Sequence, residues 1–441
     1  MSYSKSIFFI PVWFDDFEKF TAQMDDMPIW ESANWKKLWV KYLYHYASTI
    51  SKTKRANDKP KAEESQAKPK SSARRIMEKR DEDIFALFTL KDAAAAKPYL
   101  YGDVLNFTKT PVLEEVRFSA FATGVGFLEF WVSYEDMTLE EITEFSYHFK
   151  KANGAGDAYK RQLPNGEKLL WDVANSLLPK DSKIFFSSAH KTKSECNCFH
   201  FIHLDQEIPE EQERKAELYR LSRSYRTDMP VSAESDYDII YEAGPGDFWS
   251  GSPEGMANVV YDAKPGNEDY YLHTLKPKSM ENDYYFMYLL LLNQKYSAVE
   301  YIRMVSLSLE RSVDQVEQLS KRIVQLKNMF TFNVISDDSN FQNIYSKMYR
   351  ILEIKSLLED VIDNEGQLKY LQDAKQAKTD LYSNRVLYGL SALTVVSTMV
   401  DLATYLDRSI EWFHFNTLVS VLAVGAAVAF FVRLAIQSTK K

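Results

Sequence analysis

The last 56 residues of this chain contain two long apolar segments, and this feature constrains the fold more than any other. The segment 386–406 has 21 residues and one formal charge, Asp401, and the segment 413–432 has 20 residues and none apart from His414. At 1.5 Å per residue, each would form a helix of about 30 Å, the hydrocarbon thickness of a bilayer. Because only six residues separate the segments, they predict an antiparallel transmembrane hairpin. The alternative is a hairpin buried in a soluble core.

Positive charges flank the two outer ends of this hairpin. Six cations lie there: Lys375, Lys378, Arg385, Arg433, Lys440 and Lys441. The loop between the segments contains one cation, Arg408. By the positive-inside rule, both termini are then cytoplasmic. We therefore expect a multi-pass protein of the inner (plasma) membrane, with the lipid bilayer as a partner.

Polar side chains recur along the first apolar segment at helical spacing, and the second segment has no such pattern. They are Asn384, Ser391, Thr394, Thr398, Asp401 and Tyr405. Their spacings of seven, or of three and four, place them on one stripe of a helix. A polar stripe that contains a carboxylate is energetically costly to expose to lipid. We expect these residues to line a pore between copies of the chain, with Asp401 forming a ring that attracts cations. The alternative is a dry helix interface in which the hydroxyls bond to their own backbone.

Helical periodicity continues upstream of the membrane segments. Apolar residues at heptad positions over 302–330 predict a helix of coiled-coil type. After an interruption at 333–340, where Asp337, Asp338 and Ser339 can cap a new helix, no strong stop occurs before residue 405. Those 66 residues would form a helix of about 100 Å, far longer than a bilayer is thick. Such a helix can couple movement of a soluble part to the membrane, and a rigid tether has the same pattern.

The first 280 residues have a mixed α and β pattern. We expect strands at 6–14, 116–120, 127–134 and 198–204, and helices at 35–50, 138–151 and 210–222. The segment 52–80 differs, because it has 11 Lys/Arg against four Asp/Glu and almost no apolar residue. This composition predicts a disordered basic insert, either a solvated loop or a contact for acidic lipid, nucleic acid or the protein's own acidic face.

These patterns together predict four regions and the fold class. The regions are a cytosolic domain at 1–280 with its insert at 52–80, a helical stalk at 281–385, a transmembrane hairpin at 386–432 and a basic cytosolic tail at 433–441. The fold class is an α+β cytosolic domain with a long α-helical stalk and two C-terminal transmembrane helices. The formal net charge of −8 argues against direct binding to nucleic acid.

The densest set of metal-capable residues lies in one expected strand. Cys196 and Cys198 are the only cysteines, too close for a loop-closing disulfide, which is typical of a reduced, cytosolic environment. With His200 and His203 they could bind zinc, and strand alternation would place the first three on one face. The alternative is a strand edge whose histidines have other partners, so the sequence leaves open whether these residues bind a metal ion.

A glycine-rich stretch, 244–255, contains the candidate ligand-binding residues Trp249, Ser252 and Glu254. No Gly-Lys-Ser/Thr follows it and no dinucleotide fingerprint fits, so a Walker-type NTPase is not supported. The stretch is either a set of glycine turns between strands or a loop that contacts a regulatory ligand. No nucleophile elbow, zincin motif or kinase signature occurs, so we expect no catalytic residue and no enzymatic activity.

The segment 283–441 resembles the CorA-like family of magnesium and divalent-cation channels, and the soluble domain resembles it more weakly. The resemblance is carried by 284–296 (YYFMYLLLLNQKY), by the stalk at 340–385 and by the basic tail at 433–441. It implies a homopentameric funnel whose first span lines the pore, and Mg²⁺ or another divalent cation as the ion. The family's Gly-Met-Asn signature is absent, and Thr-Tyr-Leu-Asp stands at 404–407. No selectivity-filter residue is therefore carried over.

Divergent CorA-like proteins also act as antiviral membrane effectors of type III CRISPR systems. This chain is similar to them in its replaced signature and its enlarged soluble domain. We therefore expect an oligomeric membrane cation channel or transporter gated through its cytosolic domain. The alternative implied by the resemblance is an effector that permeabilises the membrane when a nucleotide second messenger, made from S-adenosylmethionine and ATP (SAM-AMP), binds. A non-conducting membrane scaffold is the third hypothesis.

Overall fold

The protein is described here by a computed structural model. It describes residues 3–33, 84–93, 111–152, 177–185, 196–205, 208, 210–232, 240–261, 271–306, 313–331, 335–336, 338–407 and 425. The chain divides into two compact units. The first comprises Met1–Ser306 and Gln318–Asn364, and the second comprises Leu307–Glu317 and Glu365–Lys441.

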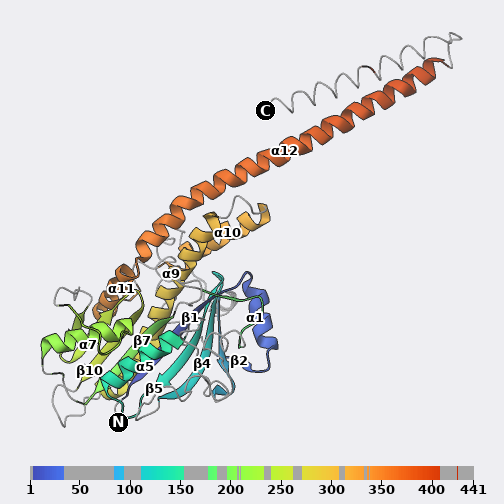
Figure 1. The fold of residues 1–441 in the computed structure, drawn as a ribbon. Helices are drawn as coiled ribbons and strands as arrows, with labels where there is room; N and C mark the ends of the chain where they lie inside the picture. Colours follow the sequence, from blue (N-terminus) through green and yellow to red (C-terminus); the bar gives the residue numbers. More distant parts are fainter. Residues whose placement is uncertain are drawn as a thin grey trace, which may run out of the picture. The chain divides into compact units, whose positions relative to one another are not determined.

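The described part of the first unit is built on one ten-stranded sheet (Figure 1). Its order is β2-β3-β4-β5-β1-β7-β10-β9-β8, and β6 pairs with β1 beside this path. The strands are β1 (Lys5–Trp13), β2 (Trp30–Ser32), β3 (Phe85–Leu90), β4 (Val112–Phe121), β5 (Val125–Ser133), β6 (Lys183–Ile184), β7 (Asn197–Leu204), β8 (Tyr241–Gly244), β9 (Asp247–Gly251) and β10 (Gly255–Tyr261). Neighbouring strands are antiparallel except β7 and β10, which run parallel.

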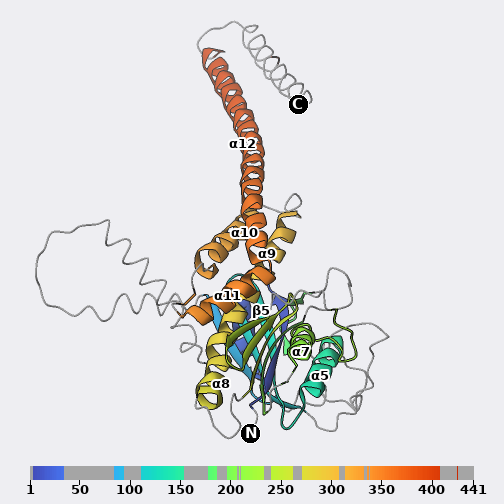
Figure 2. The same cartoon turned by 90° about the vertical axis from the view of Figure 1, so that its left-hand side faces the viewer.

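Helices cover both faces of this sheet. The helices of the described residues are α1 (Phe17–Asp26), α5 (Leu139–Ala152), α7 (Glu211–Arg223), α8 (Lys276–Ser279), α9 (Tyr285–Ser306), α10 (Val313–Gln325), α11 (Ser339–Ile351) and α12 (Ile354–Asp407), with π-helical turns η3 (Tyr271–Leu275), η4 (Met280–Tyr284) and η6 (Leu326–Phe330). In Figure 2 the sheet is seen nearly edge-on, with α5 and α7 on one side and α8 on the other. A strand covered on both faces needs apolar residues at successive positions, and β1 (KSIFFIPVW) has them.

One core lies between the sheet and helices α1, α5 and α7. In it, Phe8 of β1 stacks on Phe149 of α5, with ring centroids 4.0 Å apart. Alternation sends the next residue, Phe9, to the opposite face, where its ring lies 5.6 Å from that of Tyr288 in α9. The four residues Leu289–Leu292 of α9 are fully buried. Helix α9 is therefore a central element of the second core.

A buried carboxyl group ties α9 to the sheet. Glu129 of β5 accepts hydrogen bonds from Ser119 Oγ at 2.5 Å, Tyr285 OH at 2.7 Å and Trp131 Nε1 at 3.2 Å. Burial raises the pKa of Glu129 above its usual value, although these three donors favour the charged form. Since every donor lies on the sheet or on α9, this network fixes the position of Tyr285, the first residue of α9.

The structure confirms several elements that the sequence predicts. The expected strands at 6–14, 116–120, 127–134 and 198–204 correspond to β1, β4, β5 and β7, and the expected helices at 138–151 and 210–222 correspond to α5 and α7. Asp338 caps α11, because its side chain accepts from Phe341 N at 2.9 Å. The expected helix at 35–50 and the insert at 52–80 lie outside the described residues.

The structure shows what covers the heptad stripe of the stalk, and it corrects one expectation about the helix that follows. The heptad residues Leu319, Ile323, Leu326 and Phe330 are buried within the protein. Phe330 lies edge-on to Phe121 of β4, with centroids 5.6 Å apart. Accordingly, 281–306 and 318–364 belong to the same unit as the sheet. An apolar heptad stripe needs only an apolar surface, and the sheet supplies one.

The predicted continuous helix from residue 340 to residue 405 is also interrupted. Helix α11 ends at Ile351, and α12 begins at Ile354. Between them Glu353 has a φ of +54°, a left-handed conformation that costs a non-glycine residue about 1 kcal/mol. The turn allows Leu352 and Ile354, on either side of Glu353, to be buried together. This burial offsets the strain.

Helix α12 has 54 residues and carries the first predicted membrane segment. Large apolar residues along it are exposed, among them Leu381, Val386, Leu387, Leu390 and Val395. In the part of the chain that the structure describes, no helix combines the length and apolar character needed to cross a membrane. The second predicted segment, 413–432, lies outside the described residues apart from Gly425, as does the tail at 433–441.

Candidate functional site

The helical run that precedes α9 is unusual in its turns. Two π-helical turns, η3 and η4, flank the single α-helical turn α8. π-helical turns are rare and occur frequently at functional sites, because the wider turn redirects side chains. Between the two wide turns lies Lys276, which is almost completely buried. Lys276 is therefore the centre of the candidate site.

Lys276 forms a buried ion pair with the sheet. Its Nζ lies 2.6 Å from Asp247 Oδ2, and the two side chains are 3% and 11% exposed. Asn258 of β10 donates from Nδ2 to the other carboxylate oxygen, Asp247 Oδ1, at 2.6 Å, and to Phe248 O at 3.0 Å. Burial lowers the pKa of Lys276, while the neighbouring Asp247 opposes that shift. The cation is thus already neutralised by a partner from β9.

Aromatic rings surround the same ammonium group. Lys276 Nζ lies 4.9 Å from the ring centroid of Trp249 and 5.3 Å from that of Tyr284. The two rings are 4.7 Å apart. In a desolvated setting such contacts add cation–π attraction to the ion pair. Trp249, one of the predicted ligand residues, therefore packs on the buried pair.

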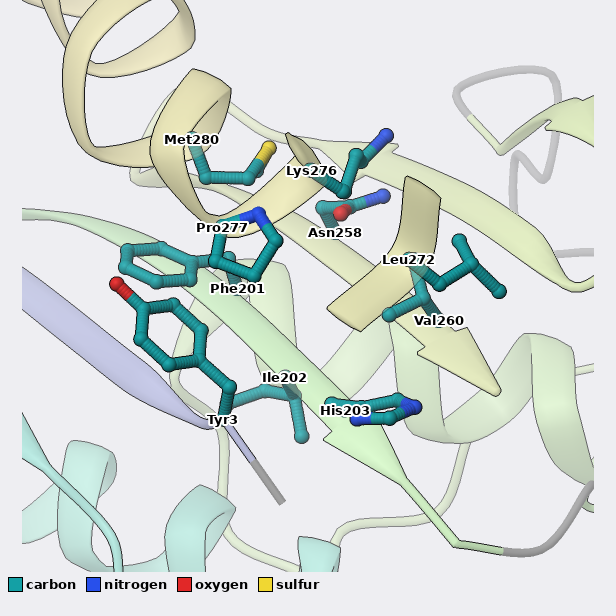
Figure 3. Close-up of a pocket in the computed structure, with 10 residues that line it drawn as sticks. All are labelled: Tyr3, Phe201, Ile202, His203, Asn258, Val260, Leu272, Lys276, Pro277 and Met280. Carbon is teal, nitrogen blue, oxygen red and sulfur yellow. The ribbon is translucent and has the colours of Figure 1, made fainter. Parts of the chain in front are cut away.

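A small pocket of about 10 Å³ lies beside this pair (Figure 3). Its walls come from the first residues of the chain, from β7 and β10 of the sheet, and from η3, α8 and η4. The lining residues are Tyr3, Phe201, Ile202, His203, Asn258, Val260, Leu272, Lys276, Pro277 and Met280. This volume is about what one water molecule needs, and it is far below the 300–1,000 Å³ that is usual for sites of drug-sized ligands.

Charged and polar groups at the rim are also paired. Tyr3 OH donates to Glu281 Oε1, and Lys5 Nζ lies 2.7 Å from the same oxygen and 2.6 Å from Glu114 Oε2. The imidazole ring of His203 lies 4.6 Å from that of His273. No strong unpaired charge therefore lines the described pocket, which has no ready cation for a phosphate group.

The structure does not bring the three predicted ligand residues together. Trp249 faces α8 and η4, whereas Ser252 and Glu254 lie in the turn between β9 and β10. Ser252 Oγ donates to Ser222 O at 2.7 Å and accepts from Gly255 N at 3.0 Å, so it organises the turn. Glu254 pairs with Lys150 of α5. The positions of Ser252 and Glu254 therefore agree with the alternative interpretation of this stretch as glycine turns between strands.

The cysteine and histidine cluster is divided by its strand. Alternation places Cys196, Cys198 and His200 on the face covered by α5 and α7, as predicted, and His203 on the opposite face. Cys198 Sγ lies 3.1 Å from Ser224 Oγ, and His200 Nδ1 lies 2.6 Å from Ser6 Oγ. Burial raises the pKa of Cys198 to about 11 and lowers that of His200 to about 3.

No metal centre emerges from this arrangement in the residues that the structure covers. Among them, no group of three or more histidine, cysteine or acidic residues is placed to hold a metal ion. His203 cannot converge with the other three residues, because it lies on the opposite face of β7. Cys198 and His200 lie within hydrogen-bonding distance of Ser224 and Ser6.

The predicted pore-lining residues lie on α12. Asn384, Ser391, Thr394, Thr398 and Asp401 are exposed, and the side chain of Tyr405 lies outside the description. Thr394 Oγ1 donates to Leu390 O at 2.9 Å, and Thr398 Oγ1 donates to Thr394 O at 2.7 Å. Hydroxyls bonded to their own backbone are what the alternative of a dry helix interface predicts. The same bonds leave hydroxyl lone pairs available on the helix surface.

Sequence reasoning missed Lys276, Asp247, Asn258 and the pocket beside them. Asp247 lies within the glycine-rich stretch, but its partner Lys276 is 29 residues away in the chain. The pairing depends on how the helix sits on the sheet, which no local pattern encodes. No known protein-family model matches this chain, and no curated protein matches it.

Proposed function

We propose that the protein is an oligomeric membrane cation channel or transporter whose activity is controlled by its soluble, sheet-containing unit. The observation that carries this proposal is α12, whose 54 residues form a helix without a break and bear the polar stripe. Asn384, Ser391, Thr394, Thr398 and Asp401 are all exposed on that helix. Such a stripe needs water or other copies of the chain beside it.

The apolar residues of α12 support the same proposal. Leu387, Leu390 and Val395 are 53–57% exposed, which is costly in water. Lipid or neighbouring copies would cover this surface. The sequence supplies a second apolar segment and flanking cations, which together define a hairpin in the inner membrane with both ends in the cytoplasm.

In the proposed assembly, several copies of α12 surround a common axis. A homopentamer, which the family resemblance implies, would place five Asp401 carboxylates in a ring. A carboxylate ring raises the local concentration of cations and repels anions. Mg²⁺ or another divalent cation is the proposed ion, and no enzymatic step is needed.

Reconstitution of the full chain into liposomes tests this function. We expect cation flux that Asp401→Asn reduces several-fold, with the oligomer intact by size-exclusion chromatography. Asp363→Asn is the matched control, because it makes the same change on α12 outside the predicted membrane segment. The proposal fails if the purified chain stays soluble without detergent, or if liposomes that contain the chain show no flux of any divalent cation.

The same liposomes separate the effector alternative from ordinary transport. SAM-AMP, the messenger made from S-adenosylmethionine and ATP, would be added on the side of the soluble unit. Flux that appears only with the messenger favours the effector, whereas flux without it favours a channel or transporter. A folded, membrane-inserted oligomer with no flux in either condition favours the scaffold.

A further inference from the structure

Arg385 of α12 has no counter-charge among the described residues. Its side chain is exposed, and it forms no hydrogen bond and no ion pair with the part of the chain that the structure describes. A helix places the residues three and four positions away next to it, and these are Leu381, Tyr382, Tyr388 and Gly389. None of the four is acidic. The carboxylate of Asp380 is five positions away and about 140° around the helix.

The surface around Arg385 is apolar and aromatic. Leu381, Tyr382 and Tyr388 are 59%, 71% and 60% exposed. Exposing large apolar groups to water is unfavourable. Tyrosine combines an apolar ring with a polar hydroxyl, and it is enriched where a membrane meets water. A cation between two exposed tyrosines therefore fits a boundary between lipid and water better than it fits bulk water.

The position of Arg385 along α12 agrees with such a boundary. It directly precedes the apolar segment 386–406, and no other formal charge occurs before Asp401, about 24 Å further along the helix. Tyr382 lies about one turn before Arg385, and Tyr388 lies about one turn inside the apolar segment. If this segment enters the hydrocarbon core, the guanidinium group lies at the level of the lipid headgroups.

Arg385 also lies on a different face of α12 from the polar stripe. At 100° per residue, it is about 120° around the helix from Ser391 and about 140° from Thr398. In the proposed assembly the stripe faces the common axis, so Arg385 is turned away from it. Its charge therefore does not belong to the pore.

We propose that Arg385 binds the phosphate group of an anionic phospholipid in the cytoplasmic leaflet, with Tyr382 and Tyr388 on either side of the headgroup. The planar guanidinium can donate two parallel hydrogen bonds to phosphate oxygens. A phospholipid supplies both things that this surface needs, because its phosphate neutralises Arg385 and its acyl chains cover Leu381. A free phosphate ion would supply only the first. The proposal rests on the proposed function, because it requires α12 to enter a membrane.

Native mass spectrometry of the full chain in detergent micelles tests this binding, because each bound lipid adds a known mass. The delipidated protein is titrated with phosphatidylglycerol, which carries one negative charge, and separately with phosphatidylcholine, which has the phosphate but no net charge. We expect phosphatidylglycerol to bind about fivefold more tightly, since one cation near an anionic headgroup contributes about 1 kcal/mol. Inorganic phosphate should displace it no better than sodium chloride of the same ionic strength, and specific displacement by phosphate overturns the proposal.

A matched pair of variants locates the site. Arg385→Gln removes the charge from an exposed side chain and should lower the affinity for phosphatidylglycerol about fivefold, to that for phosphatidylcholine. Arg350→Gln makes the same change at an exposed position of α11 and should leave both affinities unchanged.

Two results overturn the proposal. The first is equal affinity of the unchanged protein for the two lipids, which needs no variant. The second is an Arg385→Gln protein that keeps its preference for phosphatidylglycerol. If that variant also loses its oligomeric state, Arg385 pairs with a neighbouring copy instead of a lipid.

The lipid titration needs no membrane current, so its failure is distinct from that of the proposed function. If the chain inserts into liposomes and conducts but has no preference for phosphatidylglycerol, only the lipid site fails. If the preference depends on Arg385 and flux is absent, the lipid site stands and the channel does not.

Discussion

Replacing Lys276 by methionine would test the physical account of the candidate site most directly. Methionine keeps an unbranched apolar chain but removes the charge, so Asp247 would lose its partner at 2.6 Å while remaining 11% exposed. Breaking one side of a buried ion pair costs about 3–5 kcal/mol, because the remaining charge is uncompensated. Asn258 still donates to Asp247, so we expect the lower part of this range.

The second half of the prediction concerns the double variant. Lys276→Met combined with Asp247→Asn removes both charges and retains an acceptor for Asn258 Nδ2. Neutral replacements of buried ion pairs are often tolerated. We therefore expect the double variant to recover most of the loss and to unfold within about 1–2 kcal/mol of the unchanged protein.

Thermal unfolding of the full chain in detergent, followed by tryptophan fluorescence, measures both effects. A loss of 3 kcal/mol lowers the Tm of a large domain by about 6–10 °C. Lys278→Met is the control, because Lys278 is exposed two residues further along the same turn, and its Tm should not change. If Lys276→Met unfolds at the same temperature as the control, or if the double variant is as unstable as the single one, the ion pair does not have the role assigned here.

Three further predictions concern other parts of the sheet-containing unit. Burial lowers the pKa of His200 from 6.5 to about 3, so between these pH values the unfolded chain binds a proton at this residue and the folded protein does not. The folded state is therefore destabilised as the pH falls below 6.5. Between pH 6.5 and 4 the free energy of unfolding, measured by denaturant titration, should fall by about 3 kcal/mol more than in His200→Gln. Gly255→Ala should lower the free energy of unfolding by about 1–3 kcal/mol, since the added Cβ would lie 2.7 Å from the carbonyl oxygen of Ser222. Gly244→Ala is the control: its Cβ meets no atom within 4 Å, so the same titration should show a loss of less than 1 kcal/mol. Asp338→Ala removes the helix cap and should cost about 1 kcal/mol, and a Tm equal to that of the unchanged protein would contradict it.

Local patterns in the sequence located four of the ten described strands, β1, β4, β5 and β7, and helices α5 and α7. Strand β1 has apolar residues at successive positions, and the alternation in β7 correctly separates His200 from His203. Residue type and position predict a cap at Asp337, Asp338 or Ser339, and the structure assigns it to Asp338. These features depend on neighbours within a few residues, so a single sequence contains the information.

Periodicity identified apolar faces without identifying what covers them. The heptads over 302–330 predict a helical stripe, and its described residues Leu319, Ile323, Leu326 and Phe330 pack into the protein's own core. The break at Glu353 was missed for the same reason, because it has no glycine or proline to mark it. Its conformation is imposed by the burial of Leu352 and Ile354.

By itself, the sequence determined the apolar C-terminal segments, the polar stripe from Asn384 to Asp401 and the faces of the strands, because each is a periodic property of consecutive residues. Only the tertiary structure decided that Lys276 meets Asp247, that Trp249 is separated from Ser252, and that a pocket opens beside them. Contacts between residues distant in the chain depend on how whole helices pack on the sheet, and that packing is set by the sum of many side-chain shapes rather than by any one motif.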